Sequence, residues 1–419
     1  MVTAIDNAVA ESLRHRCDRL RRLGVEILTG ADAEKRAPDW VDRAVISPGI
    51  DPATPLVQHF LKRRVEMIGE LELAFELCRC PAIAITGTNG KTTTTELVQA
   101  LLTGGGMKTI SGGNIGLPFS EAVRHSSDLD YMTLEVSSFQ LEQIRTFRPK
   151  VAVWLNFAAD HLDRYSSIEE YRAAKLRIFE NQTEDDFAVV NAADQFEPLR
   201  ARTLTFSAYG LEADFSLEGN TILYHGQPVY DMTQGRLRGK HNAENLMAAF
   251  GVGIALGLAH DQLSVALREY QAPAHRCEPI RMLNEVEYVN DSKATNLDAL
   301  EKALGSETRP VVLIAGGKDK GFGYESLCEL ASEKVRYAVL IGEMAPRIAE
   351  AWNEAVTCHC CETMTDAVWK AREIAQPGDV VLMSPGTSSF DMYKSYADRG
   401  DQFRSVVQAL PSQPTTNPT

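Results

Sequence analysis

The sequence lacks the features that direct a protein to a membrane, to the cell exterior or to nucleic acid. No segment of its 419 residues approaches the roughly 20 consecutive apolar residues that a membrane span needs. The first thirty residues carry several charges and no apolar run, so we expect no signal peptide. The formal net charge of −14 disfavours nucleic acid or an anionic membrane as a partner. We therefore predict a cytoplasmic protein that meets anionic ligands through local clusters of Lys, Arg and backbone N–H groups.

The eight cysteines also lack the spacing of a structural metal site. Cys78 and Cys80 lie close in sequence, as do Cys358, Cys360 and Cys361. Neither group has a C-x2-C spacing, and no second ligand pair lies at zinc-site distance. A structural metal is therefore the disfavoured alternative, and we expect reduced, mostly packed thiols.

With 44% apolar and 24% charged residues, the chain has the composition of an ordinary globular protein of roughly three domains. Short β-branched runs alternate with helical patterns, which predicts an α/β fold with largely parallel sheets. Three blocks are expected, at residues 1–69, 70–273 and 274–410, followed by a polar, proline-rich tail at 411–419 that we predict to be disordered. The strand candidates are residues 2–5, 25–28, 44–46, 83–86, 132–136, 151–156, 188–191, 310–315, 337–341 and 379–384.

A glycine-bracketed turn and a Lys-Thr pair follow the apolar run at residues 82–86. Gly87 and Gly90 let backbone N–H groups turn inward around phosphate oxygens at a helix N-terminus. Lys91 is placed to reach terminal phosphates, and the Thr92 hydroxyl to bind magnesium. The strict eight-residue motif requires glycine where this chain has Ile85, and the alternative is a turn that only caps a helix. The sequence predicts ATP binding here.

Two further clusters follow predicted strands of the same block. Glu135 ends an apolar strand, where a carboxylate is either solvated, a cap, or a magnesium ligand; the nucleotide loop favours the metal role. His161 is flanked by Asp160 and Asp163. The aspartates are explained by a cap-forming loop, whereas His161 is interpreted as a metal or phosphate contact.

One lysine lies where an apolar residue is expected. Ser166 and Glu169 have the spacing of a capping box that starts a helix. Lys175 then falls on the apolar face that positions 168, 171 and 178 define. It either extends its ammonium group to water or is buried, and a buried lysine loses its charge or finds an anion.

The remaining candidates open a helix or follow strands of the third block. Asn242 and Asn245 could read an adenine edge or merely cap their helix. Arg276 follows a proline at the expected hinge. Residues 290–296, 316–321 and 384–389 supply the cations, amides and hydroxyls that would hold a small dicarboxylate. Open parallel sheets bind ligands beyond the carboxyl ends of their strands, so we expect an inter-domain cleft there.

Taken together, these strings resemble the Mur ligases of peptidoglycan synthesis, most closely the members that add D-glutamate. The match extends from residues 47–50 to 399–403. The string at 87–92 is common to the superfamily, which includes folylpolyglutamate synthases, and Ile85 is normal there. The strings at 113–116, 137–141 and 291–296 look like those of the D-glutamate-adding members. The resemblance implies a three-domain α/β architecture, with a central P-loop-type ATPase domain and Rossmann-like terminal domains.

The resemblance also implies roles for individual residues. ATP would be bound by Gly87, Thr88, Asn89, Gly90, Lys91, Thr92, Thr93, Asn242, Asn245, Arg276 and Asp291. Two magnesium ions would be held by Thr92, Glu135, His161 and Lys175, the last carbamylated by CO2. The substrates would be held by Asn114, Lys293, Thr295, Lys320, Ser389 and Tyr396. Lys91, Glu135, His161 and Lys175 would be the catalytic set.

The implied activity is ATP-dependent addition of D-glutamate to UDP-N-acetylmuramoyl-L-alanine by a monomer. The alternatives are another amide ligase of the superfamily and a catalytically impaired nucleotide-binding homologue. Family members begin with a strand, a glycine-rich turn and a helix, whereas residues 1–69 contain no Gly-x-Gly-x-x-Gly. The resemblance therefore implies a UDP-substrate domain at 1–69 that lacks roughly thirty residues, the size of a βαβ unit. We expect weak binding of the UDP substrate as a result.

Overall fold

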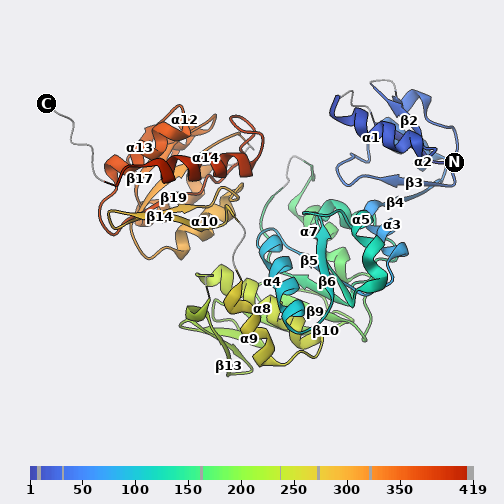
Figure 1. Ribbon diagram of the computed structural model, residues 1–419, viewed down its shortest axis with the longest axis horizontal. Helices are drawn as coiled ribbons and strands as arrows, with labels where there is room; N and C mark the ends of the chain where they lie inside the picture. Colours follow the sequence, from blue (N-terminus) through green and yellow to red (C-terminus); the bar gives the residue numbers. More distant parts are fainter. Residues whose placement is uncertain are drawn as a thin grey trace.

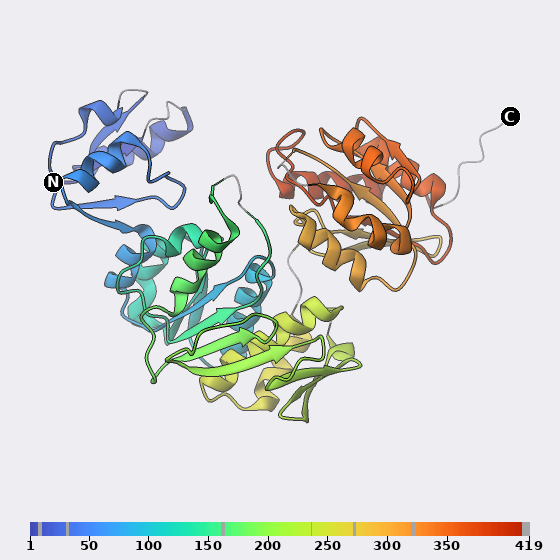
Figure 2. The same cartoon turned by 180° about the vertical axis from the view of Figure 1, so that it is seen from behind.

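The computed structural model describes residues 1–6, 11–30, 33–160, 164–235, 237–270, 274–319 and 323–412. The elements form three groups along the chain, shown in blue, in cyan to yellow, and in orange to red in Figures 1 and 2. Parallel strands dominate the two large sheets, as the predicted α/β class requires. None of the helices in the described residues combines the length and the apolar content needed to cross a membrane.

The first group contains two separate pairs of parallel strands. Strand β1 pairs with β2, and β3 pairs with β4. Their short lengths and exposed edges leave little core of their own, with Ile68 and Phe60 among the buried residues. The elements are β1 (Thr3–Asp6), α1 (Glu11–Arg22), β2 (Glu26–Thr29), η1 (Ala33–Arg36), β3 (Arg43–Ile46), α2 (Pro55–Lys62) and β4 (Glu66–Gly69).

The second group is built on a nine-stranded sheet in the order β13-β12-β11-β10-β9-β8-β5-β7-β6. Strand β5 lies between β7 and β8, parallel to both. The sheet strands are β5 (Ala82–Thr86), β6 (Thr109–Gly113), β7 (Tyr131–Glu135), β8 (Val151–Trp154), β9 (Phe187–Asn191), β10 (Arg202–Ser207), β11 (Phe215–Glu218), β12 (Thr221–Tyr224) and β13 (Gln227–Asp231).

Both faces of this sheet are covered, which explains why β5 is wholly apolar up to its last residue. Ile83 and Ile85 point into a core with α4 and α8, while Ala82 and Ala84 point into a second core on the other face. The helices are α3 (Glu70–Leu77), α4 (Lys91–Gly104), α5 (Phe119–Ala122), η2 (Val123–Asp128), α6 (Ser138–Leu141), α7 (Ile168–Leu176), η3 (Arg177–Phe179), η4 (Met232–Gln234), α8 (Lys240–Ala255) and α9 (His260–Glu269).

The third group is a six-stranded sheet in the order β14-β15-β19-β16-β17-β18, with only β14 antiparallel to its neighbour. Its two cores also lie on opposite faces. The elements are β14 (Glu278–Leu283), β15 (Val286–Asn290), α10 (Leu297–Ser306), β16 (Val311–Ala315), η5 (Tyr324–Leu327), α11 (Cys328–Lys334), β17 (Val335–Leu340), α12 (Ala345–Ala351), β18 (Cys358–Cys360), α13 (Met364–Ile374), β19 (Val380–Met383) and α14 (Tyr396–Ala409).

Every strand candidate from the sequence corresponds to a strand, with ends shifted by at most two residues. The predicted capping box was wrong by one position. Ser167, not Ser166, caps α7, because its hydroxyl accepts from the Glu170 amide. The predicted disorder of the tail concerns residues that, from 413 onward, lie outside the described ones. All eight cysteines are free thiols; Cys80 is buried and Cys360 exposed.

We expect the buried carboxylate of Glu72 in α3 to contribute strongly to stability. It accepts hydrogen bonds from the backbone amides of Arg145, Thr146 and Phe147, at 2.7 to 3.0 Å. Glu72→Ala would leave these donors unsatisfied, at a cost of roughly 1–3 kcal/mol for each buried group. Thermal or urea unfolding should therefore show a loss of about 3 kcal/mol or more.

Glu76→Ala is the matched control on the same helix. Its partly exposed carboxylate contacts only Arg43 among the described ion pairs, so its removal should cost less than about 1 kcal/mol. Equal losses for the two variants would contradict the structural role assigned to Glu72.

Candidate active site at the ends of the central strands

Four neighbouring strands of the central sheet end at one edge, and the predicted site residues follow them. The 87–90 loop follows β5, Glu135 ends β7, and Asn114 comes directly after β6. Asn156 lies two residues beyond the end of β8. Because these strands are parallel and adjacent, their ends bring the four segments together.

The 87–90 loop is held in one conformation by amides from elsewhere in the chain. The Asn89 amide donates to Asn156 Oδ1 at 2.9 Å, and Asn156 Nδ2 donates back to the Asn89 carbonyl at 3.1 Å. Gly90 has a φ of 82°, and a Cβ there would lie 2.3 Å from Asn245 Oδ1. Glycine is therefore required at position 90 by both conformation and space.

Glu135 and Thr92, two of the three predicted magnesium ligands among the described residues, contact each other. Glu135 is 2% exposed, and its Oε2 accepts from the Thr92 hydroxyl at 2.8 Å. Its Oε1 accepts from Asn114 Nδ2 at 2.9 Å, so Asn114 also lies in this cluster. No group of three or more His, Cys, Asp and Glu in the described part of the chain could hold a metal by itself. His161 lies outside the described residues.

Two lysines converge on one carbonyl oxygen at this edge. Lys91 Nζ donates to Gly87 O at 2.9 Å, and Lys175 Nζ donates to the same oxygen at 2.8 Å. Lys175 is 2% exposed and its Nζ lies 4.8 Å from the centre of the Tyr171 ring. Burial, and then the nearby Lys91 charge, lower the pKa of Lys175 well below its usual value. The alternative of a lysine extending its ammonium group to water is therefore excluded.

The pKa of Lys91 is also lowered, mainly by burial. The nearby carboxylates of Glu135 and Asp160 act in the opposite direction. Lys91 also donates to the Thr88 carbonyl at 2.7 Å, which folds its side chain back over the loop. The side chain of Thr93, the third residue of α4, is buried beside the same loop.

The two amides of α8 lie against the loop from the other side. Gly239 is the N-cap of α8, so neither Asn242 nor Asn245 caps the helix, and that alternative is wrong. Asn245 Nδ2 donates to Asn242 Oδ1 at 3.2 Å, and Asn245 Oδ1 accepts from the Thr94 hydroxyl. Both amides line a cavity of about 100 Å³ together with Gly90, Arg276, Asp291 and Lys293.

The third group of elements contributes a buried acid and a partly buried lysine to this cavity. Asp291 accepts from the Cys277 amide at 3.2 Å and from the Ser384 hydroxyl at 2.8 Å. Burial raises its pKa to about 6. Burial, and then the Arg276 charge, lower the pKa of Lys293 to about 8.

Lys293 lies beside one other predicted amino-acid contact, Tyr396. Its Nζ lies 4.0 Å from the centre of the Tyr396 ring, a cation–π distance. Thr295 lies two residues farther along the same loop, and Ser389 is buried in the loop after β19. Lys320 lies outside the described residues.

Direct contacts join the third group to the phosphate loop. Asn89 Nδ2 donates to Asp298 in the first turn of α10, and Asn296 Nδ2 donates to Asp160 Oδ2 at 3.4 Å. Helix α10 lies on the side of its domain that faces α8 in both views of the molecule (Figures 1 and 2). The loop at residues 291–296 and the loop at 87–90 therefore form one continuous site.

Comparison with known proteins agrees with this arrangement. Residues 85–253 match the model of the Mur ligase middle domain, and residues 275–387 match that of the Mur ligase glutamate ligase domain. UDP-N-acetylmuramoylalanine–D-glutamate ligase of Trichlorobacter lovleyi is 42% identical over 98% of this chain and 93% of its own length. The enzyme of that name from Pelobacter propionicus is 44% identical over 87% of this chain and 84% of its own.

The chain belongs to the Mur ligase family. Its fold is also similar to the solved structure of MurF ligase from Thermotoga maritima in complex with ADP. That comparison has a TM-score of 0.62 at 17% identity and covers 88% of this chain and 96% of the other. The predicted family and three-domain α/β architecture are therefore confirmed.

Sequence reasoning missed several residues that shape the site of this Mur ligase. Asn156 holds the phosphate loop, and the signal for it was an amide directly after a buried strand. Asp298 contacts Asn89 from another domain, and Arg399 is buried behind the amino-acid loops. The family match ends at residues 399–403 but implied no role for Arg399, and no local pattern marks Asp298, because the partners of both are distant in sequence.

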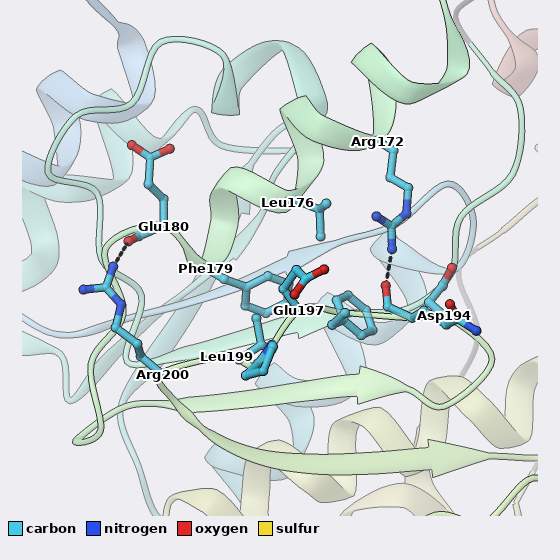
Figure 3. Close-up of a pocket in the computed structure, with 11 residues that line it drawn as sticks. Arg172, Leu176, Phe179, Glu180, Asp194, Glu197, Leu199 and Arg200 are labelled. Atoms are coloured by element: carbon cyan, nitrogen blue, oxygen red, sulfur yellow. Dashed lines mark hydrogen bonds between the residues drawn. The ribbon is translucent and has the colours of Figure 1, made fainter.

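A second cavity, of about 740 Å³, lies away from these residues (Figure 3). Arg172, Leu176 and Phe179 line it from α7 and η3, and residues 194–200 close it from the loop after β9. Figure 3 shows Arg172 donating to the loop backbone, which is the Gln195 carbonyl. None of the predicted active-site residues within the described ranges lines this cavity.

We expect Gly90→Ala to weaken ATP binding to this Mur ligase at least tenfold. The added Cβ would displace Asn245 or open the loop, because it would lie 2.3 Å from Asn245 Oδ1. Gly106→Ala is the matched control, since Gly106 has a similar φ of 83° but nothing within 4 Å of its Cβ position. Both variants should lose about 1–2 kcal/mol of stability from the left-handed backbone. Calorimetric titration with ATP would contradict the account if both variants retained the same affinity.

Proposed function

We propose that this Mur ligase joins D-glutamate to UDP-N-acetylmuramoyl-L-alanine in the cytoplasm, using ATP. The observation that carries the proposal is the single site formed by a phosphate loop, a buried carboxylate and a buried lysine on one side, and the 291–296 loop on the other. The similarity to enzymes named for this reaction, at 42–44% identity, supports the same activity.

ATP is proposed to lie along the 87–93 segment and into the cavity beside α8. The backbone N–H groups of the loop and the N-terminus of α4 would bind phosphate oxygens. The amides of Asn242 and Asn245 would face the adenine, and Asp291 the ribose. Arg276 and Lys91 would compensate the phosphate charges. Thr88, Asn89 and Thr93 would complete the contacts from the loop.

The residues present fit magnesium, which prefers hard oxygen ligands. The Thr92 hydroxyl and the Glu135 carboxylate already lie 2.8 Å apart, and phosphate oxygens would complete the coordination. His161 and the carbamate of Lys175 are proposed as further ligands, giving two ions in all. Bound magnesium would neutralise charge on the phosphates and so favour attack at the terminal phosphorus.

Lys175 is suited to carbamylation because its amine is buried beside a second cation. Only the neutral amine attacks CO2, and both burial and the Lys91 charge favour the neutral form. The product carries one negative charge in place of one positive charge. A repulsive pair of ammonium groups then becomes an attractive pair, and Lys91 gains a counter-ion.

The reaction is proposed to run in two steps. An oxygen of the L-alanyl carboxylate attacks the terminal phosphorus of ATP, and ADP leaves. The D-glutamate amine then attacks the carbonyl carbon of the acyl phosphate, and inorganic phosphate and a proton leave the tetrahedral intermediate. Contacts of the Asn89–Asp298 kind between the domains would keep water from the acyl phosphate.

D-Glutamate is proposed to bind between the loops of the third domain. Lys293 and Lys320 would pair with its two carboxylates, while Thr295 and Ser389 would donate hydroxyl hydrogen bonds. Tyr396 would cover the side chain beside Lys293. Asn114 would contact the UDP-sugar substrate. We further propose that residues 1–69, 70–273 and 274–410 form the UDP-substrate, ATP and amino-acid domains of a monomer.

Phosphate release tests this assignment directly. The protein would be incubated with ATP, magnesium and UDP-N-acetylmuramoyl-L-alanine, and with D-glutamate, L-glutamate, L-lysine or meso-diaminopimelate in turn. Among these amino acids, we expect phosphate release above background only with D-glutamate. The pairing of two cations with two carboxylates disfavours L-lysine, and the other two amino acids test stereochemistry and side-chain length. A further reaction would contain folate as the acceptor and L-glutamate as the amino acid to be added.

Two outcomes would contradict the proposal. Preferred release with another amino acid, or with folate and L-glutamate, would make the protein a different amide ligase. ATP binding without release for any acceptor would make it a nucleotide-binding homologue without ligase activity.

A further inference from the structure

Arg399 is a fully buried cation behind the loops of the third domain. It lies in the first turns of α14 and is 1% exposed. No ion pair joins it to a carboxylate within 4.0 Å among the described residues. Burial lowers its pKa to about 10, so the guanidinium stays charged at neutral pH. The carboxylates of Asp391 and Asp291 act in the opposite direction on this pKa from beyond ion-pair distance. A buried charge without a direct ion pair is costly, so its hydrogen bonds call for an explanation.

Its nitrogens donate to three different loops. Arg399 Nε donates to Ser292 Oγ at 3.0 Å, and Nη2 donates to the carbonyl of the same serine at 2.9 Å. Nη2 also donates to the Thr387 carbonyl at 3.1 Å, and Nη1 to the Gly316 carbonyl at 3.5 Å. The planar fork of arginine makes such a set of contacts, and a lysine ammonium does not.

The three loops follow three adjacent strands of the six-stranded sheet. Ser292 follows β15, Thr387 follows β19 and Gly316 follows β16, and the sheet order is β15-β19-β16. The loops also bind one another. The Lys318 amide donates to the Ser388 carbonyl at 2.8 Å, and the Gly386 amide donates to the Ala294 carbonyl at 3.0 Å. Arg399 therefore lies at the centre of a single unit.

The residues proposed to bind D-glutamate project from this unit. Lys293 and Thr295 are in the loop after β15, and Ser389 is in the loop after β19. Tyr396 is linked more closely still, because its carbonyl accepts from the Ser292 hydroxyl at 2.7 Å. The same hydroxyl accepts from Arg399 Nε. A shift of Arg399 would thus move Lys293 and Tyr396 relative to each other.

We infer that Arg399 is a positioning residue that fixes the spacing of the amino-acid-binding loops and so sets the affinity for the incoming amino acid. The inference rests on the proposed function for the identity of that amino acid, D-glutamate. Arg399 is screened from the substrate by the loops it holds. Its loss should act first on amino-acid binding, because its hydrogen bonds go to the loops of the third domain and none goes to the 87–90 loop.

The test compares Arg399→Lys with Arg281→Lys. Arg281 is a matched control in the same domain, since its guanidinium also donates to backbone carbonyls, those of Val407, Gln408 and Leu410. These lie at the opposite end of α14 from the amino-acid loops. Arg399→Lys should raise the KM for D-glutamate at least tenfold and leave the KM for the UDP substrate within twofold. The KM for ATP should rise less than that for D-glutamate, because Asp291 lies in the same loop as Ser292. Arg281→Lys should leave all three within twofold.

Hydrogen exchange provides a readout that needs no substrate. In Arg399→Lys the amides of residues 291–295, 316–319 and 386–389 should exchange at least tenfold faster together, whereas Arg281→Lys should leave them protected. If the wild type does not ligate D-glutamate, the proposed function fails, and the exchange result alone decides the role of Arg399. If D-glutamate is ligated, an unchanged D-glutamate KM would overturn the inference, as would a uniform rise in all three KM values.

Ser292→Ala covers the case in which Arg399→Lys does not fold. It removes the hydroxyl that joins Arg399 to the Tyr396 carbonyl but keeps the guanidinium and its carbonyl partners. We expect a smaller rise in the KM for D-glutamate, of about three- to fivefold, and faster exchange in the same loops. No change in either measurement would overturn the inference.

Discussion

The Gly87 carbonyl oxygen accepts hydrogen bonds from two buried lysines, and the rest of the site depends on that contact. Lys91 begins the helix that follows the phosphate loop, whereas Lys175 belongs to α7, far along the chain. Two ammonium groups on one oxygen repel each other in a site of low dielectric constant, so one of them must lose its proton or gain an anion. The geometry thereby links the conformation of the phosphate loop to the charge state of Lys175.

The same loop is also held by two side-chain amides and one carboxylate. Asn156 binds Asn89 from the end of β8, Asn245 fills the space beside Gly90, and Asp298 reaches Asn89 from the third domain. A change in the position of the third domain would therefore alter a hydrogen bond of the phosphate loop. On the other side of the cleft, Arg399 donates hydrogen bonds to the loops that carry Lys293 and Ser389, and so holds these loops together.

Most of the fold could be predicted from the sequence because its strands, turns and helices follow from local patterns of apolar and turn-forming residues. The buried strand at Ala82–Thr86 and its glycine-rich turn predict their own structure, whereas the position of Lys175 on an apolar face left two alternatives, exposure and burial, of which the structure shows burial. The cap of α7 was misplaced by one residue because two serines stand side by side, and only the backbone conformation selects Ser167. The roles of Asn156, Asp298 and Arg399 depend on contacts between distant segments. Such contacts produce no recognisable spacing of residues along the sequence.

The carbamate on Lys175 is the central chemical claim, and carbon-13 NMR tests it most directly. The protein would be equilibrated with ¹³C-bicarbonate near neutral pH, with Lys150→Ala as the control for a lysine at the protein surface. The account predicts a carbamate resonance, distinct from those of bicarbonate and CO2, that persists in Lys150→Ala and disappears in Lys175→Ala. The carbamate assignment would be contradicted if the wild-type protein ligated D-glutamate but showed no such resonance. It would also be contradicted if the resonance remained in Lys175→Ala.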